Sequence, residues 1–125
     1  MNQSLYILLL VSVGLLSMTK DNCKKHFAGK WKYSDMPAEK MYVERTKNKQ
    51  LEYIEDGKYY YEFEIKWVNS CKYQAIYKGT NSPYPANTAI GEATTIEILE
   101  ITRDKMKYHT KFGDVEETAE MTRID

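Results

Sequence analysis

The chain has 125 residues, with 18 Lys and Arg and 18 Asp and Glu, so its formal net charge is zero. Basic and acidic residues are interspersed, and the lack of a basic stripe argues against binding to a nucleic-acid backbone. The sequence also lacks the acidic tail or basic amphipathic helix that would suit a membrane surface. About a hundred residues follow the N-terminal apolar segment, enough for one domain with a modest core.

The N-terminal residues have the pattern of an export signal. Residues 6–16 form an apolar run of the length typical of a secretory signal core, and they are too short for a membrane span. Small residues follow at Ser17 and Thr19. We therefore expect residues 1–19 to be a signal peptide, and residues 20–125 to be a secreted or periplasmic domain with no stable membrane span. No Lys or Arg precedes the run, so an uncleaved anchor or a buried N-terminal helix remains the alternative.

Two cysteines, Cys23 and Cys71, remain after removal of the signal. In an exported chain an even pair predicts one disulfide, and the alternative is two buried free thiols. The bond would close a loop of roughly fifty residues and stabilise the fold by on the order of 4 kcal/mol in the loop-entropy model. Two cysteines and two distant histidines have no metal-ligand spacing, so we expect neither a metal nor a cofactor.

The first predicted strand begins at the segment FAGKWKY. Phe27, Gly29, Trp31 and Tyr33 fall on one face at period two, and lysines fall on the other. This alternation predicts a half-buried strand. A glycine inside it indicates that another group approaches the backbone closely.

The rest of the chain is predicted to form seven more strands. They cover residues 41–46, 51–55, 58–68, 71–79, 94–102, 105–112 and 115–124. Asp56-Gly57 favours a type I′ hairpin turn, because both central residues of that turn need positive φ. Further turns are expected at Asn69-Ser70, Arg103-Asp104 and Gly113-Asp114, and residues 80–93 form one long irregular connection with two prolines.

Eight successive strands joined mostly by tight turns predict an all-β, antiparallel up-and-down meander. An open meander of this size would expose two sheet edges, and closure removes both. We therefore expect a small, closed, eight-stranded barrel.

The two ends of this barrel resemble a known superfamily. Gly29-Lys30-Trp31 is similar to the Gly-x-Trp motif in the first strand of the lipocalin and fatty-acid-binding-protein (calycin) superfamily. The resemblance implies that Trp31 closes one end, with Arg123 of the last strand across its indole ring as a cation–π partner. The connection 34–40 is too short for the helix pair of fatty-acid-binding proteins, and no segment matches the C-terminal helix of true lipocalins. The sequence thus looks like a minimal lipocalin-like domain of the bacterial type.

The inward faces of the predicted strands are rich in aromatic residues. The candidate ligand-binding residues are Tyr59, Tyr61, Phe63, Tyr73, Tyr77, Tyr108 and Phe112. Tyrosines combine ring area with a hydroxyl, which suits an amphipathic ligand. We expect a monomer that binds a small hydrophobic or amphipathic molecule in a narrow pocket at the end opposite Trp31.

Catalysis is not expected. His26 and His109 both fall on outward faces, where a solvated surface group is the simpler interpretation than a general base. An eight-stranded barrel is also just wide enough either to fill itself with side chains or to hold one small ligand. The alternative function is therefore a side-chain-filled barrel that binds a protein or glycan through its outer face, around Tyr60, or through the 80–93 loop.

Overall fold

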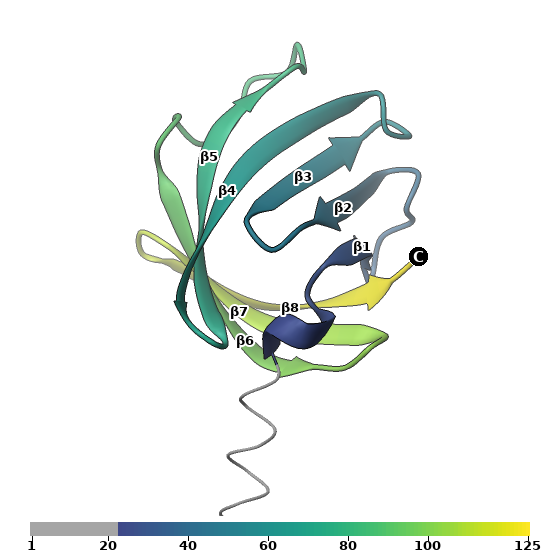
Figure 1. The fold of residues 1–125 in the computed structure, drawn as a ribbon. Coiled ribbons are helices and arrows are strands. Elements are labelled where there is room, and N and C mark those ends of the chain that lie inside the picture. Colours follow the sequence, from purple (N-terminus) through teal and green to yellow (C-terminus); the bar gives the residue numbers. More distant parts are fainter. Residues whose placement is uncertain (1–22) are drawn as a thin grey trace, which may run out of the picture.

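The computed structural model describes residues 23–125 as one closed antiparallel barrel, so the predicted signal peptide lies outside the described residues. The elements are the 3-10 helix η1 (Cys23–His26) and the strands β1 (Gly29–Tyr33), β2 (Met41–Arg45), β3 (Lys49–Ile54), β4 (Tyr59–Asn69), β5 (Lys72–Thr80), β6 (Ala93–Ile101), β7 (Lys105–Phe112) and β8 (Val115–Arg123). The strands follow one another in chain order, and β8 pairs with β1 to close the sheet (Figure 1). The predicted eight-stranded meander and its closure are confirmed. The described part of the chain has no helix with the length and apolar character needed to cross a membrane.

Several strand boundaries differ from the predictions by one or two residues. β1 begins at Gly29, and Phe27 lies between η1 and the strand rather than inside it. The β4–β5 turn is centred on Ser70 and Cys71, one residue later than expected, because the Asn69 side chain accepts a hydrogen bond from Cys71 N at 2.9 Å. The turn at Asp56-Gly57 forms as predicted: φ is 57° and 83°, and Lys58 N donates to Glu55 O at 3.2 Å.

Side chains fill the end of the barrel where β1 begins and β8 ends. Phe27, Trp31, Met106 and Met121 are almost completely buried there. Trp31 lies opposite Arg123 in the β1–β8 register, and its indole Nε1 donates to Phe27 O at 3.0 Å. We call Phe27, Trp31, Met106, Met121 and Arg123 the closed end. The helix η1 lies on its outer side, at the bottom of Figure 1.

Arg123 joins several segments at the closed end. Its guanidinium carbon lies 4.4 Å from the centroid of the Trp31 ring. It also donates to the carbonyl oxygens of His26 at 2.6 Å, Ala28 at 3.0 Å and Arg103. These are three main-chain groups that the strand ladders leave unpaired. The contact that the sequence resemblance implied between Arg123 and Trp31 is present.

Gly29 is the glycine that this arrangement requires. Its φ is +130°, a conformation that residues with a side chain rarely adopt, and a Cβ there would overlap Nη1 of Arg123. The close approach that the sequence indicated is therefore made by the guanidinium of the last strand.

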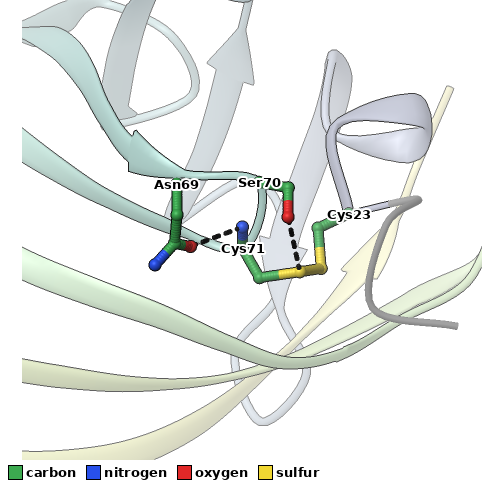
Figure 2. The surroundings of a disulfide bond; sticks show 4 residues. All are labelled: Cys23, Asn69, Ser70 and Cys71. Carbon is green, nitrogen blue, oxygen red and sulfur yellow. Dashed lines mark hydrogen bonds between the residues drawn. A yellow bond between two sulfur atoms is a disulfide. The ribbon is translucent and has the colours of Figure 1, made fainter. Parts of the chain in front are cut away.

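A disulfide fixes η1 to the barrel wall. Cys23 is bonded to Cys71 in the β4–β5 turn, 48 residues later, and Figure 2 shows Asn69 and Ser70 next to Cys71. The predicted disulfide is confirmed. Since η1 leads directly to Phe27, the bond also holds one residue of the closed end in place.

Removing this bond tests its contribution. We expect the double variant Cys23→Ser/Cys71→Ser to lose about 4 kcal/mol of unfolding free energy, because the unfolded chain regains the freedom of a loop of roughly fifty residues. Urea unfolding of the two proteins measures the difference. The variant Ser70→Ala, in the same turn, is the matched control and should remain within about 0.5 kcal/mol of the parent. Equal stability of the double variant and the parent would contradict the prediction.

Arg123→Lys tests the closed end. A lysine keeps the charge but cannot reach three carbonyls and cover the indole at once, so we expect a loss of about 3 kcal/mol. Thermal unfolding followed by Trp fluorescence measures it. Arg103→Lys is the control, because the side chain of Arg103 is exposed and only its carbonyl takes part. Similar effects of the two substitutions would show that the closed end does not depend on the guanidinium.

Candidate functional site

The half of the barrel away from Trp31 contains a cavity of about 570 Å³, which we call the inner cavity. Its walls come from every strand and from the connections at residues 34–40 and 80–93. The lining residues are Tyr33, Asp35, Met36, Met41, Arg45, Gln50, Glu52, Phe63, Tyr73, Ala75, Thr88, Thr94, Ile96, Tyr108, Thr110, Glu117 and Ala119. The barrel is thus filled at one end and hollow at the other.

Arg45 is the deepest charged residue of this cavity. It is 5% exposed and lies next to the closed end, with its guanidinium 4.9 Å from the Phe27 ring. Nε donates to Gln50 Oε1 at 2.9 Å, and Nη1 contacts the sulfur of Met106 at 3.6 Å. Among residues 23–125, no carboxylate forms an ion pair with it. A cation this deeply buried is usually paired.

Gln50 and Glu52 extend the polar network toward the open end. Arg45 and Gln50 lie opposite each other in the β2–β3 register, and Glu52 follows two residues later on the same face of β3. Gln50 Nε2 donates to Glu52 Oε1 at 3.5 Å, and the Tyr33 hydroxyl donates to the same oxygen at 3.1 Å. Gln50 therefore connects the guanidinium to the carboxyl group without bringing them into contact.

The titratable groups of the network have shifted pKa values. Burial raises the pKa of Glu52, against the opposing effects of the Tyr33 hydrogen bond and the Arg45 charge. The pKa of Tyr33 lies well above its usual value because of the Glu52 charge and burial. Burial also raises the pKa values of Tyr73 and Tyr108. All three phenols therefore keep their protons at neutral pH, and the proton of Tyr33 is already donated to Glu52.

A second cavity, of about 440 Å³, lies toward the open end, and we call it the mouth cavity. It shares Met41, Glu52, Phe63 and Thr88 with the inner cavity, so the two are adjacent. Its other lining residues are Ile54, Tyr61, Tyr77, Tyr84, Pro85, Ala86 and Asn87. Most of these side chains are apolar or aromatic, in contrast to the charged network at the inner end.

The 80–93 loop forms one wall of the mouth cavity. The Tyr84 hydroxyl donates to Glu55 Oε1 at 2.6 Å, and its ring meets Tyr59 edge-on with centroids 6.1 Å apart. These contacts hold the loop against the β3–β4 turn. The loop is therefore part of the cavity wall as well as a surface connection.

The predicted ligand-binding residues divide into three groups in the structure. Phe63, Tyr73 and Tyr108 line the inner cavity, and Tyr61 and Tyr77 line the mouth cavity together with Phe63.

Tyr59 and Phe112 line neither of these cavities. Tyr59 is the first residue of β4 and packs on Tyr84, while Phe112 is the last residue of β7 and pairs with Val115 across the next turn. Both lie at the ends of their strands.

Sequence reasoning did not select the polar residues of the site. Arg45 shares its face with the buried Val43, so the alternation of residues 41–45 carried a signal for its inward position. Gln50 lies in the connection between the predicted strands 41–46 and 51–55, but β3 begins at Lys49 and pairs Gln50 with Arg45, which places Gln50 and Glu52 on the inner face. Tyr33 was placed inward in the sequence pattern but not among the candidate ligand contacts. Sequence reasoning missed this network because charged side chains are expected to face the solvent.

The histidines lie apart from the cavities. His109 contacts Thr118 and Glu116 at 3.2 Å each on the outer surface. No group of three or more His, Cys, Asp or Glu side chains within residues 23–125 is placed to hold a metal ion.

Comparisons of this chain with protein-family models, with curated proteins and with solved structures found no match. The case for a function therefore depends on the geometry of the cavities.

Glu52 predicts a pH dependence of stability. Because its pKa is raised from 4.5 in the folded state, the folded protein keeps this proton to higher pH than the unfolded chain. Its contribution to stability is greatest below the unfolded value and declines as pH rises through the folded pKa. Glu52→Gln, which keeps an acceptor oxygen for Tyr33, should remove this decline. Urea midpoints between about pH 4 and about pH 8 measure it. The exposed Glu100→Gln control should keep the parent profile, and an unchanged profile in Glu52→Gln would refute the assignment.

Proposed function

We propose that this protein is an exported, non-catalytic binding protein of a minimal lipocalin-like type, which holds one small amphipathic molecule inside its barrel. The observation that carries the proposal is the inner cavity, which is closed at one end and polar at its base. Its volume of about 570 Å³ falls in the usual range for small-molecule sites. The adjoining mouth cavity offers aromatic and apolar side chains to the rest of the molecule.

Two further observations support the proposal. The disulfide is compatible with an extracellular or periplasmic location, where such bonds persist. The closed end, with Arg123 over Trp31 and Gly29 beneath the guanidinium, agrees with the lipocalin-like pattern in the sequence. Together they favour a small exported barrel that acts as a monomeric carrier or scavenger.

The outer face offers the alternative site. Tyr42, Tyr53 and Tyr60 form a row across β2, β3 and β4, with ring centroids 4.8 Å and 6.4 Å apart. The stacked rings of Tyr42 and Tyr53 cover each other, so they do not form a flat platform for a sugar ring. We therefore place binding of a protein or glycan on this face second to binding in the cavity.

A bulky residue inside the cavity separates the two functions. We expect the uncharged fluorophore N-phenyl-1-naphthylamine to bind the parent protein with an increase in emission. Ala119→Trp, which fills the inner cavity, should weaken this binding at least tenfold. Ala93→Trp adds the same side chain at an exposed position and should bind like the parent. Failure of the folded parent protein to bind the probe, or equal binding by both variants, would overturn the proposal.

A further inference from the structure

The inner cavity contains two charged groups that are close together yet not paired with each other. Two opposite charges that lie near each other without direct contact indicate the chemical class of the ligand. We propose that the ligand carries an acidic group and an amino group on neighbouring atoms, as an apolar or aromatic α-amino acid does, with the acid at Arg45 and the amine at Glu52. This inference rests on the proposed function, because it specifies the molecule held in the same cavity.

Arg45 provides the site for the acid. A guanidinium has five N–H donors. Gln50 and the weak sulfur acceptor of Met106 use two of them, and the Tyr73 hydroxyl is a further hydrogen-bond partner, so donors remain for a ligand. No carboxylate in the described part of the chain forms an ion pair with it. Glu52 acts on this cation electrostatically without contacting it, and a ligand carboxylate would supply a counter-ion in direct contact.

Glu52 provides the site for the amine. Both of its hydrogen bonds, from Tyr33 and Gln50, reach Oε1, and Oε2 accepts none from residues 23–125. An ammonium group donating to Oε2 would complete the carboxylate. The aromatic rings of Tyr33, Phe63 and Tyr108 also line this cavity, and their faces attract a cation.

Gln50 sets the relation between the two charges. Its oxygen accepts from Arg45 and its nitrogen donates to Glu52, so one side chain holds both groups in place. The two charged residues line the same cavity and are linked through one amide group and its two hydrogen bonds. Opposite charges on neighbouring atoms of a small ligand match such a pair.

The charges of the lining argue against simpler head groups. Among residues 23–125, Arg45 is the only cation that lines the inner cavity, whereas Asp35, Glu52 and Glu117 contribute three carboxyl groups. A ligand with an acid alone would add a fourth. A ligand with an amine alone would leave Arg45, the deepest charge, without a counter-ion. A head group with both charges satisfies each residue and adds no net charge to the cavity.

The order of residues along the barrel axis gives the direction of the ligand. Arg45 and Gln50 line only the inner cavity, whereas Glu52 lines both cavities. The acid therefore lies deepest and the amine next to it. The apolar part of the ligand extends into the mouth cavity, among Phe63, Tyr61 and Tyr77.

Three compounds with one common ring system test the inference. Tryptophan has both groups, indole-3-propionate has the acid alone, and tryptamine has the amine alone. Calorimetric titration at neutral pH should show tryptophan binding at least tenfold more tightly than either of the others. Equal or tighter binding of indole-3-propionate or of tryptamine would overturn the inference.

Two substitutions should have opposite effects on the single-charge compounds. Glu52→Gln removes the partner of the amine, so it should weaken tryptophan and tryptamine at least tenfold and tighten indole-3-propionate. Arg45→Met should weaken tryptophan and indole-3-propionate and tighten tryptamine. Glu44→Gln, on the outer face of β2, is the control and should bind like the parent. Damage to the fold would weaken all three compounds alike, and that pattern in Glu52→Gln would count against the inference.

The naphthylamine probe separates this inference from the proposed function. If the parent protein binds the probe but none of the three indole compounds displaces it, the cavity binds small molecules and the two-charge head group is wrong. If the parent protein binds neither the probe nor the compounds, both proposals fail. Displacement of the probe by tryptophan at lower concentration than by the other two compounds supports both.

Discussion

The side chain of Arg123 is the interaction on which the closed barrel depends. A sheet closes only where its first and last strands meet, and β1 is one of the shortest strands, with five residues. The guanidinium adds three hydrogen bonds to main-chain carbonyls and a cation–π contact where the strand ladder is short. Three of these contacts reach residues 26–31, so the last strand holds residues 26–31 in place.

This closure also determines where the cavity lies. Large apolar side chains fill the barrel interior next to Arg123. Toward the other end, small residues such as Ala75 and Ala119 alternate with the rings of Tyr73 and Tyr108 around an open interior. The Arg45–Gln50–Glu52 network stands at the border between the two halves. A buried network of this kind is costly for folding alone, which is one reason to ascribe it to binding.

The fold could be predicted from the sequence because its signals are local. The alternation from Tyr59 to Trp67 and the turn at Asp56-Gly57 depend only on neighbouring residues, and both appear in the structure. Closure of the barrel could be predicted because an open sheet of eight strands would expose two edges. The pairing of Arg123 with Trp31 spans almost the whole described chain, and it could be anticipated only through resemblance to a known superfamily.

The candidate site was harder to predict because its polar residues break the usual relation between charge and exposure. Arg45 and Glu52 stand on strands whose outward faces also carry charge, such as Glu44, so composition does not separate the two faces. The inward positions of Arg45 and Gln50 are tied to each other by the β2–β3 register, and a shift of one residue in that register would exchange the inner and outer faces. Tyr59 and Phe112 differ from the prediction in the opposite way. The period-two alternation predicts that their side chains face the cavity, but both residues lie at strand ends and line neither cavity.

The disulfide has a mechanical consequence. Cys23 and Cys71 enclose β1, β2, β3 and β4 in one covalent loop. A pulling force applied to the chain before residue 23 passes through the sulfur atoms into the β4–β5 turn. Tension therefore enters the chain at β5 and never loads the backbone of the first four strands. With the bond intact, extension can draw out only the 55 residues from Cys71 to Asp125, fewer than the 103 residues from Cys23 onward.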